Sequence, residues 1–287
     1  MFISFRGWSI IEEKLSISEF VDLDSIIEQF CKLRPKRFTS DSKYEEILFL
    51  LCKNGKLNLL KPLLEELDDK NLQDKDKYSL LHCAAEQGHI SIVQYLFPFL
   101  NDKLPKTGSN KRLPSSDGAG TVRINKETPL HRAARNGHLD VIEYMLLHID
   151  DGEINPEKSN GWTVLHDAAY FGHLNVVAFY TNKLDNPNPG RISKNKFRGR
   201  TPLHGAAQQG HLEVVKHFCN LLQDKNPRDH HGDTPLHRAA AAGHIAIVKY
   251  LVQFLYNKHP KSGSFKTPLD YAIDQDQTEV IDFLTKQ

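Results

Sequence analysis

Histidine is the residue type whose number and spacing most readily suggest chemistry in this sequence. The chain holds 15 histidines among 287 residues, and imidazole is a common metal ligand and a general base near neutral pH. Ten of them occupy two fixed places of a recurring block, the end of T-P-L-H (or a variant of it) and the position after a glycine. The first set is His82, His131, His166, His204 and His237, and the second is His89, His138, His173, His211 and His244. We predict structural roles, the first set bonding around a helix cap and the second standing at a turn between helices.

The remaining candidates for chemistry are equally weak. His230 and His231 lack nearby ligands other than His237, and no cysteine lies close to them, so a zinc site is disfavoured. Asp167 follows His166 directly, but adjacent helix positions point in different directions. We therefore expect Asp167 to face solvent rather than to pair with that histidine. The sequence has no G-x-S-x-G, no G-x-x-x-x-G-K-[ST] and no H-E-x-x-H, which predicts no enzyme activity, no metal and no cofactor.

The block that carries these histidines specifies two short helices. Thr201 suits a helix N-cap and Pro202 the first helical position, where a missing N–H costs nothing. Ala206 and Ala207 give the first helix a side of little bulk, so that another helix can approach. Gly210 ends that helix in the left-handed conformation that such an end favours, and a second apolar helix follows. Because so short a helix is marginal alone in water, it must be stacked on copies of itself.

The block returns 33 positions later, and T-P-L-H-x-A at that period is a solenoid signature. On these residues the chain resembles the ankyrin-repeat family. The resemblance implies an all-α ankyrin-repeat solenoid of five clear repeats between degenerate caps. Each unit would carry a β-turn finger and two antiparallel helices, and the concave side of the stack would bind other proteins.

The histidine marks divide the chain into units. Successive T-P-L-H histidines lie 49, 35, 38 and 33 residues apart, and we assign the departures from 33 to loops. The predicted units are an N-terminal helical extension and linker at 1–41 and a repeat array at 42–287. Within the array we expect a degenerate cap repeat at 42–76, repeats at 77–122, 123–157, 158–195, 196–228 and 229–261, and a C-terminal cap repeat at 262–287.

Three regions depart from the regular pattern. The first repeat carries an insertion, Asn101 to Thr121, that is rich in Lys, Pro, Gly and Ser and is expected to be a flexible excursion of the finger. Residues 1–41 are expected to contain an amphipathic helix that either covers the open end of the first repeat or docks a partner. In the last unit a polar D-Q-D-Q-T-E stretch is expected to face water.

Composition points to a protein of the cytoplasm, with the nucleus also possible. The formal net charge is +1, so no bulk attraction to nucleic acid or membrane is indicated. Four cysteines lie far apart without a C-x-x-C pair and are interpreted as reduced core thiols. We see no signal peptide and no apolar segment near the 20 or so residues that span a bilayer.

The family resemblance also implies which positions contact a partner. The residues directly before each cap are Tyr78, Glu127, Trp162, Arg200, Asp233 and Lys266, and these are expected to be free to contact it. The predicted partner-binding residues are Trp162, Tyr170, Phe171, Arg135, Asn136, Arg198, Arg200, Gln208 and Gln209. The three aromatic residues are expected to form one exposed patch with a polar rim. In the alternative, Tyr170 or Phe171 fills space beneath a neighbouring finger.

The function that follows is a non-catalytic, monomeric protein-interaction scaffold. A second hypothesis is recognition of a phosphorylated or nucleic-acid ligand through the basic loop Arg191 to Arg200, together with Lys111, Arg112 and Arg123. A solvated loop is the simpler interpretation of that basic run. Salt dependence separates the two functions, because binding through several phosphates weakens steeply with salt.

Overall fold

The computed structural model describes most of the chain from Ser42 onward. The described residues are 42–65, 67, 70, 72–74, 76–108, 112–114, 121–123, 126–149, 153–190, 199–255 and 257–287. The predicted extension at 1–41 and most of the basic run, residues 191–198, lie outside them. The chain divides into two compact units, residues 1–70 and 71–287.

The described part of the first unit is one pair of helices, α3 (Ser42–Lys53) and α4 (Leu57–Glu65). Gly55 has a φ of 70° between them. Tyr44 is buried and its hydroxyl donates a hydrogen bond to the carbonyl of Leu63, 2.9 Å away. The helix pair lies where the sequence predicts the degenerate cap repeat.

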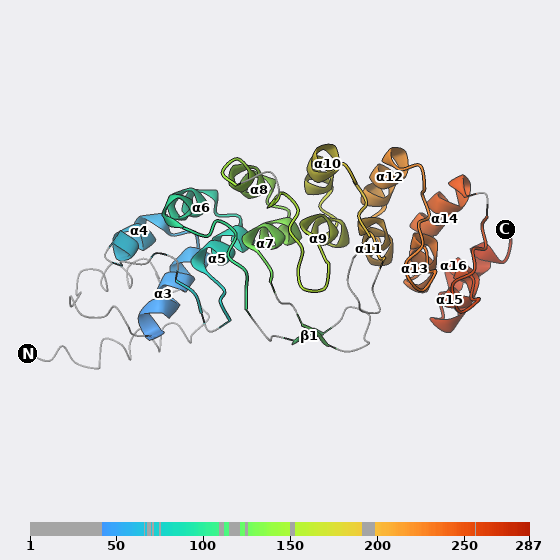
Figure 1. Ribbon diagram of the computed structural model, residues 1–287. Coiled ribbons are helices and arrows are strands. Elements are labelled where there is room, and N and C mark those ends of the chain that lie inside the picture. The colour runs from blue at the N-terminus through green and yellow to red at the C-terminus, as the bar shows by residue number, and fades with distance from the viewer. Residues whose placement is uncertain are drawn as a thin grey trace, which may run out of the picture. The chain divides into compact units, whose positions relative to one another are not determined.

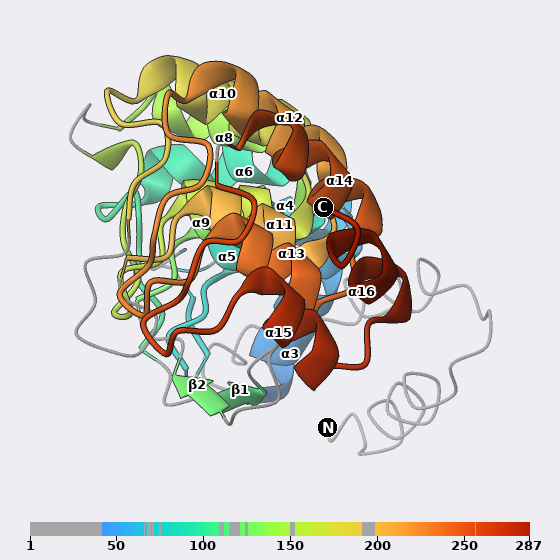
Figure 2. The same ribbon diagram turned by 90° about the vertical axis from the view of Figure 1, so that its right-hand side faces the viewer.

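The second unit consists of six helix pairs within its described residues. They are α5 (Leu80–Gln87) and α6 (Ile90–Leu96), α7 (Pro129–Asn136) and α8 (Leu139–Leu146), α9 (Val164–Phe171) and α10 (Leu174–Lys183), α11 (Pro202–Gln209) and α12 (Leu212–Leu221), α13 (Pro235–Ala241) and α14 (Ile245–Phe254), and α15 (Pro268–Asp274) and α16 (Thr278–Leu284). A 3₁₀ turn, η1 (Phe97–Phe99), extends α6. Each first helix contacts the first helix of the next pair, from α5 to α15, and Figure 1 shows them in one row. Seen along that row, the second helices lie on one side and the connecting loops run down the other (Figure 2). The predicted helical solenoid is confirmed.

The caps form as the sequence predicts. Thr128 precedes α7 in extended backbone, with φ −102° and ψ 164°, and Pro129 takes the first helical position. The backbone N–H of Thr128 donates to Nδ1 of His131, 3.2 Å away. Gly137 ends the helix with φ 77°. This places the start of α8 two residues further on and turns the chain back.

Small side chains let the first helices approach one another. Ala133 and Ala134 of α7 are fully buried, as are Ala206 and Ala207 of α11. Each second helix contributes branched or aromatic side chains, such as Phe218 of α12, to the layer behind them. Apolar burial of this kind is the main source of stability in a stacked array.

The third finger is a tight turn closed by two backbone hydrogen bonds. In the third repeat the N–H of Lys158 donates to the carbonyl of Trp162, and the N–H of Gly161 to that of Lys158, both at 2.9 Å. Gly161 has a φ of 74°, and Lys126 takes the equivalent place in the second repeat with φ 69°. The second finger therefore keeps its left-handed residue although that residue is not glycine.

The insertion in the first repeat is more ordered than predicted. Leu104 is buried, and the N–H of Thr107 donates to the carbonyl of Glu127 over 2.9 Å. Further on, β1 (Arg112–Pro114) pairs antiparallel with β2 (Thr121–Arg123), a local exception to the all-α class. Thr107 thus bonds to the next finger and Gly108 to Asp76 of its own finger, so the end of the described part, residues 104–108, packs against the array, while a flexible excursion stays a prediction for the rest of the insertion.

The last repeat exposes two large apolar side chains, one in its finger and one in α15. Phe265 stands where Gly161, Gly199 and Gly232 stand in other fingers; its φ is 62° and it is 79% exposed. Ile273 replaces the second alanine of the block and is half exposed. Residues 274–276 are exposed as predicted.

Candidate partner-binding surface

The block histidines fix the finger residues that lie on this surface. Nε2 of each T-P-L-H histidine lies 3.0 to 3.4 Å from the backbone carbonyl just before the next repeat's cap, at residues 127, 162, 200, 233 and 266. Because a carbonyl only accepts, Nε2 carries the proton and Nδ1 accepts from the cap. The prediction that these histidines are structural is confirmed, and the structure adds that they join neighbouring repeats.

The second set of histidines bonds in the opposite direction. Nε2 of His138, His173, His211 and His244 lies 2.8 to 3.1 Å from a carbonyl of the preceding repeat.

Three histidines of the first set, at the end of T-P-L-H or its variant, have strongly lowered pKa values. Burial lowers the pKa of His82 and His204 to about 4, and that of His131 to about 3. These three imidazoles are therefore neutral at pH 7.

Three aromatic side chains of the third repeat touch one another in sequence. The ring centroids of Trp162 and Tyr170 lie 5.5 Å apart and those of Tyr170 and Phe171 5.3 Å apart, both edge to face, an arrangement that aromatic pairs favour. Nε1 of Trp162 donates to Oδ1 of Asp167 over 2.9 Å. Phe171 is the outermost ring, with 42% of its surface exposed. We call Trp162, Tyr170 and Phe171 the aromatic ledge.

Polar residues border the aromatic ledge on both sides. The Arg135 guanidinium lies 5.3 Å from the centre of the Phe171 ring. On the other side, Nε2 of Gln209 donates to the Tyr170 hydroxyl over 2.9 Å, and a Cβ at Gly205 would lie 3.5 Å from the Tyr170 ring. The ledge therefore reaches onto the first helix of the fourth repeat.

The structure describes the other predicted residues, with one exception. Asn136 is turned back, its Nδ2 donating to the carbonyl of Arg132. Arg200 donates through Nη1 to Oε1 of Gln208 over 3.4 Å. Arg198 lies outside the described residues.

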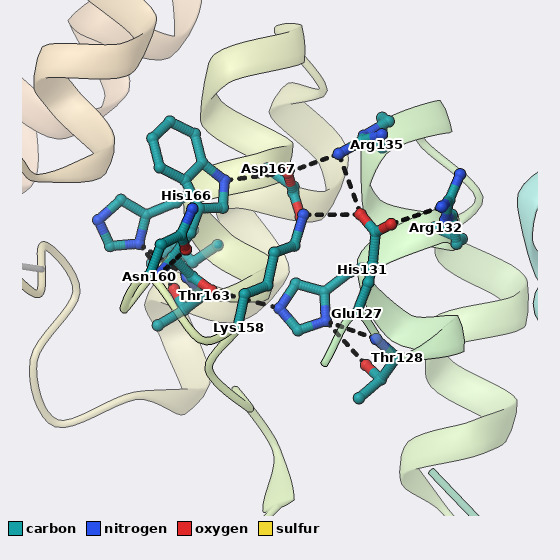
Figure 3. Close-up of polar contacts among 12 residues, drawn as sticks. Glu127, Thr128, His131, Arg132, Arg135, Lys158, Asn160, Thr163, His166 and Asp167 are labelled. Atoms are coloured by element: carbon teal, nitrogen blue, oxygen red, sulfur yellow. Dashed lines mark hydrogen bonds and ion pairs between the residues drawn. The ribbon is translucent and has the colours of Figure 1, made fainter. Parts of the chain in front are cut away.

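Next to the ledge, around Arg135 and Asp167, lies a buried ionic cluster that no sequence pattern predicts. Lys158 Nζ lies 2.7 Å from Glu127 Oε1 and 2.7 Å from Asp167 Oδ2, and Figure 3 shows it between the two carboxylates. Arg132 and Arg135 approach Glu127 to 2.6 and 3.0 Å. We call these five residues the Glu127 cluster.

Two predictions are therefore wrong. Glu127 was expected to be free to contact a partner and Asp167 to face solvent, but both are buried. The cause is the third finger, whose Lys158 inserts between the two acids. Burial favours the neutral form of Glu127, but Lys158, Arg135 and Arg132 outweigh it and hold the pKa of Glu127 well below its ordinary value.

A second cluster of the same kind lies in the fifth repeat. Arg238 Nη2 lies 3.1 Å from Asp229 Oδ2 and 2.7 Å from Asp233 Oδ2. Arg200 Nε lies 3.6 Å from Asp229, and the Tyr271 hydroxyl donates to Asp233. Asp233, like Glu127, was expected at a free finger position and is instead buried.

Comparison with known proteins decides the family. The sequence profile of ankyrin repeats, in a three-copy form, matches residues 48–111, 106–191, 181–262 and 219–287. The chain belongs to the ankyrin-repeat family. Ankyrin repeats generally mediate protein–protein interactions, and the family is typically non-catalytic.

Two curated relatives match a limited part of this ankyrin-repeat chain. It is 28% identical over 108 residues to the mitochondrial liver isoform of glutaminase from Rattus norvegicus, and 34% identical over 108 residues to that from Mus musculus. Each match covers 35% of this chain but only 18% of the relative. So short a match carries no enzymatic activity over to this protein.

Neither a metal site nor a membrane span emerges from the part of the chain that the structure describes. In it, no three His, Cys, Asp or Glu side chains are placed to hold a metal ion together. Its helices are also too short or too polar for any of them to cross a bilayer.

Proposed function

We propose that this ankyrin-repeat chain is a non-catalytic module that binds another protein through the aromatic ledge and its rim. The rim consists of Arg135, Asn136, Arg200, Gln208 and Gln209, and Arg198, outside the described residues, stays a sequence prediction. The observation that carries the proposal is the exposed Phe171 ring at the end of an otherwise half-buried row of aromatic rings. Large aromatic residues with polar surroundings are the usual centres of binding energy in protein interfaces.

The ledge is held in place before any partner arrives. Trp162 is fixed by its bond to Asp167, and Tyr170 by Gln209 and by the neighbouring ring. A surface that is already ordered loses little conformational entropy on binding, and this raises its affinity. Such a surface suits a scaffold that presents one rigid face.

The phosphorylated or nucleic-acid ligand remains the alternative, and the described contacts favour a protein. Of the basic run Arg191 to Arg200, the structure describes Arg200, which faces Asp229 and Gln208. We further place the protein in the cytoplasm, with the nucleus also possible, as a monomer without catalytic activity.

An affinity purification with a matched pair of variants tests the proposal. Phe171→Ala removes the exposed end of the ledge, and Phe254→Ala removes an aromatic of similar exposure at the end of α14. We expect Phe171→Ala to lose proteins that the wild type and Phe254→Ala both retain. If all three retain the same proteins, the ledge is not the binding surface.

A further inference from the structure

In both buried clusters the arginines reach the surface, whereas the carboxylates that pair with them do not. The carboxylates of Glu127, Asp167, Asp229 and Asp233 are only 0 to 5% exposed, whereas the side chains of Arg132, Arg135, Arg200 and Arg238 are 12 to 20% exposed. A partner that lies on this side of the array therefore meets N–H donors, and the acceptors that balance them lie underneath. One carboxylate does not follow this rule: Glu86, which pairs with Arg132, is 29% exposed.

Two of these arginines have donors to spare. Arg135 uses Nη2 for both Glu127 and Asp167, and Arg238 uses Nη2 for both Asp229 and Asp233. A guanidinium has five N–H donors. Among the described contacts, neither arginine engages its Nη1. A carboxylate from outside can accept from that nitrogen without displacing the internal partners.

The Arg135 guanidinium also lies beside the aromatic ledge. Its 5.3 Å approach to the Phe171 ring places a cation and an exposed apolar surface next to each other. A ligand that satisfies both must carry an acidic group adjacent to an apolar side chain. Charged hydrogen bonds of this type are among the stronger ones in proteins.

The spacing of the two arginines sets the length of the ligand. Arg135 lies on α7 and Arg238 on α13, with α9 and α11 between them in the row of first helices (Figure 1). Packed helices lie about 8–10 Å apart, so three steps span roughly 25–30 Å. An extended chain covers about 3.3 Å per residue, which corresponds to about eight or nine residues.

We propose that the partner binds through an extended acidic segment. One carboxylate pairs with Arg135, an adjacent aromatic or aliphatic side chain packs on Phe171, and a second carboxylate about eight or nine residues away pairs with Arg238. The inference rests on the proposed function, since it names the chemistry of the ligand for the same surface.

Selection from a random peptide library tests the inference with the full chain. Twelve-residue peptides displayed on phage are selected on the wild-type protein, and an enriched peptide is compared with a twin in which each Asp and Glu becomes Asn and Gln. We expect enriched peptides to combine acidic with aromatic or aliphatic residues, and the twin to bind at least tenfold more weakly by fluorescence anisotropy. Neutral or basic peptides, an equally strong twin, or a library without binders would overturn the inference.

Variants of the protein separate this inference from the proposed function. Arg135→Lys keeps the charge above Glu127 and Asp167 but loses the second terminal nitrogen, so the acidic peptide should bind it several-fold more weakly. Phe171→Ala should also bind it more weakly, and Phe254→Ala should bind it as the wild type does. If peptides depend on Phe171 yet are not acidic, only the acidic-segment inference fails. If peptides bind Phe171→Ala as tightly as the wild type, the proposal that the aromatic ledge binds the partner is wrong.

Discussion

Glu127 and Lys158 form an ion pair that joins the second repeat to the finger of the third. Their charged atoms lie 2.7 Å apart, and their side chains are 0% and 4% exposed. Removing one member of a buried pair leaves an uncompensated charge, which typically costs about 3–5 kcal/mol. The pair therefore makes the stacking of these repeats sensitive to single substitutions.

Lys158→Met is expected to lower the free energy of unfolding by about 3–5 kcal/mol. The buried carboxylates of Glu127 and Asp167 would both lose the ammonium group that pairs with them. Urea denaturation measures this. The double variant Glu127→Gln/Lys158→Met should recover part of the loss. Lys216→Met, at an exposed pair with Glu213, should change stability by less than about 1 kcal/mol. Equal effects at the exposed and buried lysines would contradict the role of the pair.

Acidification should destabilise the array in a window set by its histidines. The folded-state pKa values of His82, His131 and His204 lie at about 3 to 4, below the ordinary value of about 6.5. The unfolded chain therefore binds more protons as the pH falls below about 6.5, and stability is lost towards pH 4. The lowered pKa of Glu127 causes a further loss of stability at lower pH, as the pH falls below the ordinary pKa of a glutamate.

Urea midpoints at pH 7.5, 6 and 5 check this window. We expect the free energy of unfolding to fall by at least about 2 kcal/mol between pH 7.5 and 5. His131→Asn, which removes one of these imidazoles, should show a smaller fall. A wild type with constant stability over this range would contradict the neutral assignment.

Phe265→Gly should stabilise the protein. A left-handed backbone costs a non-glycine residue about 1–2 kcal/mol, and Phe265 has little buried surface to lose. Glycine gives back about 0.5–1 kcal/mol through the entropy of the unfolded chain, so the net gain is about 0.5–1 kcal/mol. A thermal melt measures it, and a lower midpoint than the wild type would show that the Phe265 ring contributes contacts.

Ala207→Leu should destabilise the protein by about 1–3 kcal/mol, because the side chain of Ala207 is fully buried and its helix, α11, contacts α9 and α13. Ala246→Leu, at an exposed position of α14, is the matched control and should be nearly neutral. Denaturation of both variants checks the assignment. An unchanged midpoint for Ala207→Leu would contradict the prediction that first helices pack closely at this alanine.

The repeated block predicts the helices and their caps because each depends on neighbours in the sequence. Thr128 and Gly137 act within a few residues of themselves, so their types are informative. The Glu127 cluster depends instead on Lys158 reaching across from the next finger, which no local pattern shows. One signal was present: an acid precedes T-P-L-H-R at Glu127 and again at Asp233. In both, the residue before the cap pairs with the arginine five positions later.

The aromatic ledge was predictable because its members share fixed places in one repeat. Trp162 precedes the cap, and Tyr170 and Phe171 end the first helix, so the fold brings them together. Their edge-to-face contacts and the stacking of Arg135 on Phe171 could not be predicted, since these depend on side-chain rotamers and on the neighbouring repeat.

The most direct test of the account is the affinity of the Phe171→Ala variant for a purified partner, measured by calorimetry together with its melting temperature. Because Phe171 is the outermost ring of the ledge and is 42% exposed, we expect stability close to that of the wild type. Binding should weaken by at least about 2 kcal/mol, or roughly thirtyfold in the dissociation constant, while Phe254→Ala binds as the wild type does. A Phe171→Ala variant that keeps wild-type affinity would contradict the account.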